Sequence, residues 1–366
     1  MTSWMKYRAR VASLVTSLVT GLAVVGLVGG LNAATAAADE VRVLNWKGWG
    51  TDESWAVAEF EKSTGNKVVH DYITSFPEVF TKLRTNPGYY DVVVLNAAFV
   101  GKAAEDGLIQ PVDATAIPNF ADLYPDMRDT PQLIFDGKVW GVAWVWGGTS
   151  VTYDTNVFKT PPTSLDVLWD SAHANRVCWR DNAEDSVRFA ALALGQNPDH
   201  PEDMDAIREK LRALKPQVKA FWKSGDEWLK LVAAKECDLS IVWTNNTEAA
   251  VLQDNLPLSF IVAKEGAIAF RDGLTMATNA PNEKGALAFM NYMISKEFYA
   301  GWVNVGGAPV SANAKAVDEL PTSSLTRQIL TTPDAIKRLN FKGPLSDEQR
   351  QAYLELWQET KAYFAE

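Results

Sequence analysis

Tryptophans and polar side chains follow several of the strands that the sequence predicts. In an α/β sheet, ligands bind outside the carboxyl ends of the strands, so residues at those positions are the first candidates for binding. Aromatic faces attract a cation, and a carboxylate holds an ammonium through a short, charge-assisted hydrogen bond. This mixture predicts a site for a small molecule that carries a protonated amine. The candidate ligand-binding residues are Trp46, Trp49, Asn96, Asn182, Asp185, Trp243, Phe270 and Asp272.

Several candidates also have a purely structural explanation. Trp46 and Trp243 lie at strand ends and are as compatible with a core as with a cleft. Asp185 could be a helix N-cap or a first-turn acid favoured by the helix dipole. Asp272 directly follows an apolar run, where an unpaired acid is costly. The binding hypothesis therefore depends most on Asp272.

Sequence signatures of catalysis are missing from the chain. It has no Gly-rich phosphate loop, no G-x-S-x-G, no H-E-x-x-H and no C-x-x-C, and its three histidines are scattered. We therefore expect a binding protein rather than an enzyme, with no cofactor and no metal. One alternative is an exported hydrolase that pairs the acids of residues 181–185 with Asp272. A receptor domain that signals to a membrane partner is a second alternative.

Strands and helices alternate along most of the chain. Unbroken apolar runs, such as residues 91–95, fit strands that are buried on both faces of a parallel sheet. The pattern predicts strands at 41–45, 67–72, 91–95, 177–179, 239–243 and 258–262, and helices at 52–63, 77–84, 185–194, 204–214, 226–234, 247–252 and 347–363.

Two extended, β-prone stretches separate two βα-rich regions of similar size. Residues 139–153 and 268–276 do not follow the helix period, and we interpret them as crossings between two α/β lobes. The predicted lobe 1 comprises 39–147 plus 273–318, and lobe 2 comprises 148–272 plus 319–366. The alternative is one large sheet with long insertions.

The N-terminus has the order of an export signal. Basic residues, an apolar stretch at 11–31, small residues and then an acidic start predict a signal peptide over 1–38. The alternative is a retained membrane anchor. Removing 1–38 changes the net charge from −10 to −13, so nucleic acid is a poor partner. Outside the inner membrane Cys178 and Cys237 can form a disulfide, and two buried thiols are the alternative.

A set of short motifs resembles the periplasmic spermidine/putrescine-binding proteins of bacterial ABC importers, over nearly the whole mature chain. The resemblance implies an α/β, two-lobe periplasmic binding protein fold with a hinged ligand cleft. It also implies a periplasmic location, an inner-membrane ABC permease as partner, and a monomer. The motifs are Asn45-Trp46-x-x-Trp49, Thr64-Gly65-x-Lys67-Val68, Tyr90-Asp91-Val92-Val93-Val94, Trp146-Gly147-x-Thr149, Ile241-Val242-Trp243, Lys264-Glu265-Gly266, Asp272 and Gly306.

Position by position, the resemblance implies that the residues holding one amine of the ligand are retained, while other ligand-binding positions carry different residues. Trp46, Trp49 and Trp243 match aromatic walls, Asp272 matches the acid that holds a terminal ammonium, and Asp185 takes the place of a family Glu. The departures are Asn182 for a second amine-binding Asp, Ala98 and Gly307 for Tyr, and Phe270 for Trp.

These departures leave two ligand classes open. The first expectation is a polyamine (putrescine or spermidine) or a related cationic amine. The alternative is a zwitterionic ω-amino acid such as γ-aminobutyrate, because Arg180 and Arg271 lie near the predicted cleft and a guanidinium can hold a carboxylate. Strand alternation predicts that Arg271 points away from Asp272.

Overall fold

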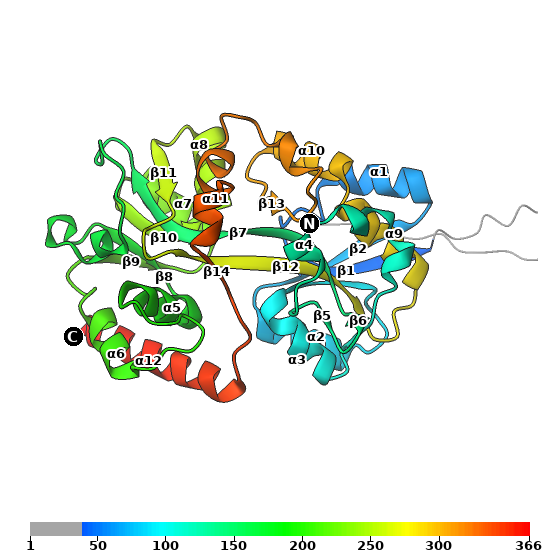
Figure 1. Ribbon diagram of the computed structural model, residues 1–366, viewed down its shortest axis with the longest axis horizontal. Coiled ribbons are helices and arrows are strands. Elements are labelled where there is room, and N and C mark those ends of the chain that lie inside the picture. Colours follow the sequence, from blue (N-terminus) through cyan, green and yellow to red (C-terminus); the bar gives the residue numbers. More distant parts are fainter. Residues whose placement is uncertain (1–38) are drawn as a thin grey trace, which may run out of the picture. The chain divides into compact units, whose positions relative to one another are not determined.

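One large mixed sheet runs through the molecule, and a separate two-stranded sheet lies within residues 134–139. The computed structural model describes residues 39–366, so the expected signal peptide lies outside the described residues. The sheet has twelve strands, and its main order is β2-β1-β3-β12-β7-β10-β8-β9 (Figure 1). The strands β2, β1 and β3 form what we call the β1 end, and β10, β8 and β9 form the β10 end. The predicted α/β class is confirmed.

The β1 end is a parallel βα unit. Its strands pair in parallel, and every residue of β3 is buried, as the apolar run predicts. The helix α1 ends at Gly65, whose positive φ of 75° is the left-handed conformation that favours glycine. The elements are β1 (Glu40–Trp46), α1 (Ser54–Thr64), β2 (Lys67–Ile73), α2 (Phe76–Thr85), β3 (Val92–Asn96), α3 (Ala97–Glu105), β4 (Ile109–Gln110), α4 (Pro125–Arg128), β5 (Ile134–Phe135) and β6 (Lys138–Val139).

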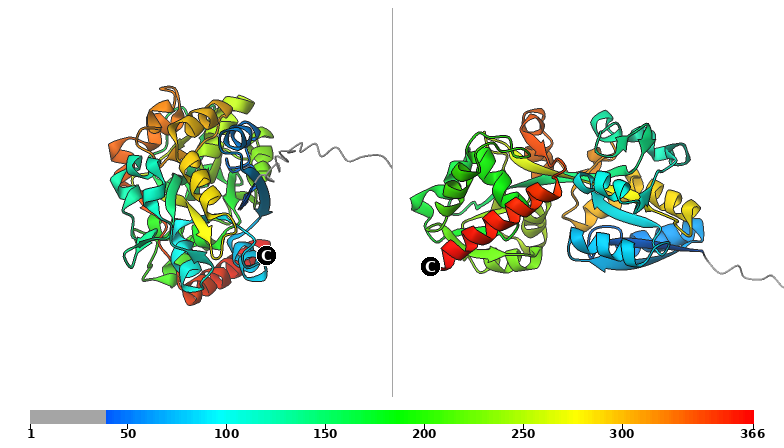
Figure 2. Two further views of the ribbon diagram at one scale, coloured as in Figure 1. Left: turned by 90° about the vertical axis from the view of Figure 1, so that its right-hand side faces the viewer. Right: turned by 90° about the horizontal axis from the view of Figure 1, so that it is seen from below.

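The β10 end repeats this architecture. Its three strands are again parallel, and they carry a separate hydrophobic core that includes Val177, Trp179 and Ile241. Helix α12, the red helix in the right-hand view of Figure 2, packs along α5 and α6. The elements are β8 (Val177–Arg180), α5 (Ala183–Ala193), α6 (Met204–Arg212), β9 (Val218–Trp222), α7 (Gly225–Ala233), β10 (Leu239–Trp243), α8 (Thr244–Asp254), β11 (Leu258–Ile261), α11 (Pro333–Lys337), β14 (Leu339–Phe341) and α12 (Asp347–Ala365).

Two long strands connect the two ends. They are β7 (Val142–Asp154) and β12 (Ala267–Ala277), which pair antiparallel along their length and correspond to the predicted crossings. After β12 the chain adds α9 (Glu283–Met293), α10 (Lys296–Val305) and β13 (Val310–Ser311), and β14 then pairs with residues 267–269 of β12. The domain boundaries given above stay a prediction.

The carboxyl ends of β3 and β10 point toward each other. β12 is antiparallel to both β3 and β7, so β3 runs in the direction of β7, whereas β10 runs against it. Asn96 ends β3 at the level of Val145, and Trp243 ends β10 at the level of Thr149. Four residues of β7 separate these levels, about 13 Å along the strand. Side chains from both ends of the sheet therefore face a common short interval.

Helix α1 begins at Ser54, two residues later than the sequence predicts. Thr51 does not cap α1, because Glu53 occupies that position and the buried Thr51 hydroxyl accepts a hydrogen bond from the Asn45 side chain. Among the described residues, the structure contains no helix with both the length and the apolar character needed to span a membrane.

A disulfide joins Cys178 of β8 to Cys237, which lies just before β10. This confirms the predicted pairing. The bond closes a segment with a sequence separation of 59 residues, and it ties together two strands whose ends carry candidate site residues.

Replacing both cysteines by alanine should therefore destabilise the protein by about 4 kcal/mol, because the unfolded chain regains the entropy of an open loop. The measurement is urea unfolding of the wild type and the double variant, each with and without reductant. Reductant should lower the stability of the wild type only. If the oxidised wild type and the double variant unfold at the same urea concentration, the disulfide contributes nothing.

Candidate functional site

Asp272 is a buried acid in the middle of β12. Its side chain is only 8% exposed, and it lies beside Asn96 in the strand register. One carboxylate oxygen accepts a hydrogen bond from Nδ2 of Asn96 at 3.0 Å, and the other accepts one from Nε1 of Trp49 at 3.1 Å. These three predicted site residues, which are distant in sequence, are brought together by the structure. With Phe270 they form what we call the acid cluster.

Local structure holds both donors in place. Asn96 is the N-cap of α3, and its Oδ1 accepts a hydrogen bond from the backbone N–H of Ala98, which directs Nδ2 toward Asp272. Trp49 lies in the turn after β1, where Nδ2 of the fully buried Asn45 donates to its carbonyl at 2.9 Å. The acid cluster is thus built on backbone that secondary structure fixes.

The Asp272 carboxylate has no ion-pair partner among residues 39–366. Desolvation by burial raises its pKa to about 6, while the hydrogen bonds from Asn96 and Trp49 and the charge of Lys342 act in the opposite direction. Neutral hydrogen-bond donors alone offset only part of the cost of burying a carboxylate. A cation that enters beside it would supply the missing partner.

Aromatic rings adjoin the acid cluster. Phe270 lies on the same face of β12 as Asp272, two residues away. It pairs with Gly147 across the strands, and a Cβ at Gly147 would lie 2.6 Å from the Phe270 ring, so only glycine leaves room for that ring. The Trp49 ring centroid is 6.0 Å from that of Phe270. These rings provide an apolar surface for methylene groups next to the acid.

Trp46 adjoins the acid cluster through its backbone, because its carbonyl accepts a hydrogen bond from the backbone N–H of Trp49 at 3.3 Å. Its ring meets Phe76 edge-on with the centroids 4.8 Å apart, and Phe76 stacks on Phe99 at 4.2 Å. Trp46 is half-buried, so its position at the end of β1 makes it partly a packing residue and partly a surface residue.

A second cluster of predicted residues lies at the β10 end. Asp185 is almost fully buried in the first turn of α5, and its carboxylate bonds to Arg180 Nη1 and to Lys342 Nζ. Although desolvation raises the pKa of Asp185, Lys342 and Arg180 together hold it at about 2. Asn182 is the N-cap of α5 and accepts the Asp185 backbone N–H at 2.9 Å. Both of these side chains therefore have partners within the protein.

Trp243 belongs to this second cluster through Arg180. The guanidinium carbon of Arg180 lies 4.1 Å from the Trp243 ring centroid, and Trp222 meets the same ring edge-on at 5.6 Å. We call Arg180, Asp185, Lys342 and Trp243 the cation cluster. A cation is already seated on the aromatic face where the sequence predicts a ligand amine.

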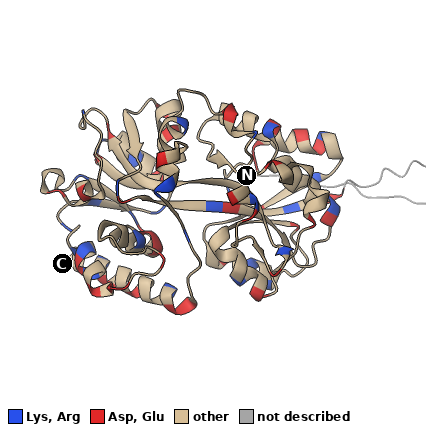
Figure 3. Cartoon of the chain, viewed as in Figure 1, with Lys and Arg blue, Asp and Glu red and all other residues tan. Residues whose placement is uncertain are grey.

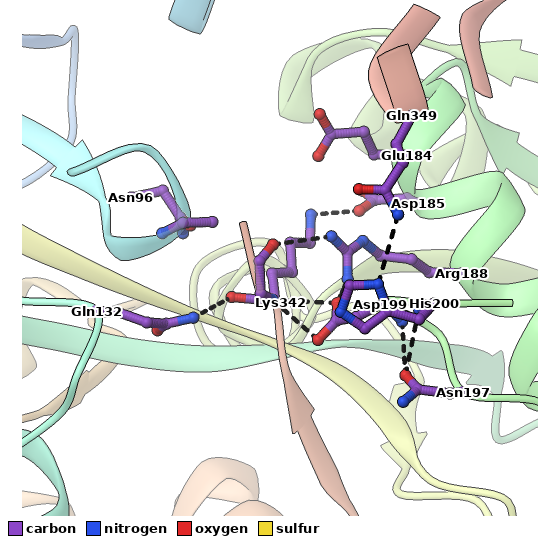
Figure 4. Close-up of polar contacts among 12 residues, drawn as sticks. Asn96, Gln132, Glu184, Asp185, Arg188, Asn197, Asp199, His200, Lys342 and Gln349 are labelled. Atoms are coloured by element: carbon purple, nitrogen blue, oxygen red, sulfur yellow. Dashed lines mark hydrogen bonds and ion pairs between the residues drawn. The ribbon is translucent and has the colours of Figure 1, made fainter. Parts of the chain in front are cut away.

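Lys342 connects the two clusters. It follows β14, its charge acts on both Asp272 and Asp185, and in the view of Figure 4 it lies between Asn96 and Asp185. Its carbonyl accepts a hydrogen bond from Gln132 at 2.7 Å, which anchors it to the loop after α4. Sequence reasoning missed Lys342, because no local pattern distinguishes it from a surface lysine.

Arg271 points to the opposite face of β12 from Asp272, as strand alternation predicts. Its Nη1 donates to Thr130 and Gln132, and its guanidinium carbon lies 4.5 Å above the Phe341 ring. Arg271 is therefore a structural residue of the crossing rather than a member of either cluster.

Comparisons with known proteins agree with this architecture. Residues 55–327 match the family model described as "Bacterial extracellular solute-binding protein". A spermidine/putrescine-binding periplasmic protein of Haemophilus influenzae is 29% identical over 338 residues, 90% of this chain and 91% of the relative. Its namesake from Escherichia coli is 30% identical over 270 residues, 72% of this chain and 76% of the relative.

A solved structure has the same fold. The substrate-binding protein of a spermidine/putrescine ABC transporter from Streptococcus pneumoniae superimposes with a TM-score of 0.78 at 19% identity. The superposition covers 89% of this chain and all of that one. The likeness confirms the predicted periplasmic binding protein fold.

The raised pKa of Asp272 predicts a pH dependence of stability. Because the folded state holds this proton more tightly than the unfolded chain does, Asp272 makes folding less favourable as the pH rises from about 4 to above 6. Relative to an Asp272→Asn variant, the ligand-free wild type should lose up to about 3 kcal/mol of unfolding free energy over that interval. Urea unfolding of both proteins from pH 4 to pH 7.5 measures this. A difference that stays constant with pH would show that Asp272 titrates normally.

Proposed function

Because the chain belongs to the bacterial extracellular solute-binding proteins, we propose that it is the periplasmic substrate-binding component of an ABC importer for a small amine. Its relatives are named for spermidine and putrescine, which places polyamines and related cationic amines first among the candidates. The observation that carries the proposal is the buried, unpaired carboxylate of Asp272 beside the rings of Trp49 and Phe270.

A protonated amine would complete this site. The ammonium would lie next to the carboxylate, where no described cation is present, and the ligand's methylene groups would pack on Phe270. Binding to the charged form of Asp272 would draw its pKa downward. Two or three buried anchors of this kind support a micromolar dissociation constant, about −8 kcal/mol.

We further propose that the β1 end and the β10 end are the two lobes, and that β7 and β12 form the hinge between them. Arg350 of α12 supports this picture. Its guanidinium carbon lies 4.6 Å from the ring centroid of Phe99 in α3, and its Nη1 donates to Glu184 at 2.8 Å. Arg350 therefore connects helices of the two ends without belonging to either cluster. Such contacts favour the closed, liganded form by differential affinity.

The proposal includes delivery to an inner-membrane permease and action as a monomer. It includes no chemical turnover, so bound ligand should be recovered unchanged. The hydrolase alternative needs a second available carboxylate near Asp272, whereas Asp185 is bonded to Arg180 and Lys342, and Asp181 accepts from Lys361 and Trp357 at 2.9 Å and 2.7 Å.

Replacing Asp272 by alanine should weaken amine binding by ~2–5 kcal/mol, because the ammonium would be buried without its partner. Calorimetric titration of the exported protein with a panel of amines, among them putrescine and butylamine, measures the loss. Asp205→Ala is the matched control, since that carboxylate is exposed and, among residues 39–366, pairs only with Arg208 of its own helix. If Asp272→Ala binds every amine as tightly as the wild type does, the site assignment is wrong.

Replacing Arg350 by alanine should speed ligand release without removing a ligand contact. The lost cation–π contact with Phe99 is worth about 0.5–2 kcal/mol, and the effect should appear in the dissociation rate. Stopped-flow tryptophan fluorescence gives both rate constants. Arg350→Lys, which keeps a charge near Glu184, should lie between the wild type and Arg350→Ala. Equal dissociation rates in all three proteins would argue against closure across α3 and α12.

A further inference from the structure

The cation cluster carries one more positive charge than its acids balance. Arg180 and Lys342 both bond to the single carboxylate of Asp185. The other acids in this region have cations of their own: Glu184 pairs with Arg350, Asp181 with Lys361 and Asp199 with Arg188. The β10 side of the site therefore has a net charge of about +1, in a region where side chains are largely shielded from water.

Both cations keep donors that are not used within the described protein. Arg180 bonds to Asp185 through Nη1, and no other hydrogen bond of its guanidinium involves a described residue. The Lys342 ammonium likewise bonds only to Asp185 among the described residues. A guanidinium has five N–H donors and an ammonium has three, so a second oxyanion could bind both without displacing Asp185.

The acid cluster, in contrast, carries an unbalanced negative charge. Asp272 contributes one negative charge and is matched by no cation within the described residues. It lies at the level of Val145 on β7, whereas the cation cluster begins at the level of Thr149 with Trp243, and Phe270 lies between them opposite Gly147. The site thus presents one unpaired acid and one surplus cation at its two ends, with an apolar ring in between.

This arrangement distinguishes between ligand classes. A diamine would place its second ammonium against the surplus positive charge of Arg180 and Lys342, and like charges in a poorly solvated site repel strongly. In the view of Figure 3, acidic and basic positions are mixed along the helices. The preference between ligand classes rests on the local charges of the two clusters.

We infer that the ligand is a short-chain ω-amino acid, whose ammonium binds Asp272 and whose carboxylate binds Arg180 and Lys342. The inference rests on the proposed function and narrows its ligand from small amines in general to zwitterions. The methylene chain lies across Phe270, and the net charges of ligand and site are both zero.

The test is calorimetric titration of the dialysed, exported protein with five probes. These are γ-aminobutyrate, 5-aminopentanoate, putrescine, butylamine and butyrate, at pH 7.5. At least one of the two ω-amino acids should bind ten or more times as tightly as putrescine, butylamine and butyrate. If putrescine or butylamine binds as tightly as the better ω-amino acid, the inference is overturned and the proposed capture of an amine stands. If no probe with an ammonium binds, the proposed function itself fails.

One variant and its matched control test whether Lys342 binds the carboxylate of the ligand. Lys342→Gln should weaken the better ω-amino acid at least tenfold more than it changes the affinity for butylamine, because butylamine has no carboxylate. Lys361→Gln is the matched control, since it also removes a lysine bonded to an acid, but that acid is Asp181. Equal losses for both probes in Lys342→Gln would place the lysine outside the ligand's carboxylate. The wild-type titrations test the ligand class even if a variant fails to fold.

Discussion

A buried carboxylate that the protein does not neutralise dominates this structure. Asp272 receives hydrogen bonds from Asn96 and Trp49 but meets no ion-pair partner among residues 39–366. Hydrogen bonds from neutral donors offset only part of the cost of removing such a charge from water, which is why its pKa is raised to about 6. The buried position of the Asp272 side chain is maintained because strand β12 and the N-cap of α3 fix the backbone around it. Under the proposed function, a bound cation would offset the cost of burying this charge.

Asp185 shows how strongly environment decides the behaviour of one residue type. Both aspartates are buried, yet the pKa of Asp272 is raised and that of Asp185 is held at about 2. The difference comes from Arg180 and Lys342, which surround Asp185 with opposite charge. In the proposed site, Asp272 is the acid left for a ligand, while Asp185 holds Arg180 and Lys342. Such a division of roles would distinguish the two ends of a small molecule.

The sheet topology is what brings these groups into register. Parallel strands at each end place their carboxyl termini at the interval between Val145 and Thr149 on β7, and the antiparallel pair β7 and β12 sets the distance. The disulfide between Cys178 and Cys237 ties β8 to the segment before β10, the two strands that carry Arg180 and Trp243. Strands and helix ends therefore carry the candidate site, and in the proposed hinge any motion would involve the two connecting strands and contacts such as Arg350 with Phe99.

The sequence alone determined most of the long strands and the positions at which function could lie, but it missed β9 and the helices α3, α9 and α10. Unbroken apolar runs predicted the buried strands, strand alternation predicted that Arg271 and Asp272 face opposite ways, and the predicted export signal allowed the disulfide to be expected. Only the tertiary structure decided which charged side chains neutralise one another. Lys342 lies 157 residues from Asp185, and Asn96 lies 176 residues from Asp272. Charge balance in a site is a property of residues brought together by strand order, and no local sequence pattern records it.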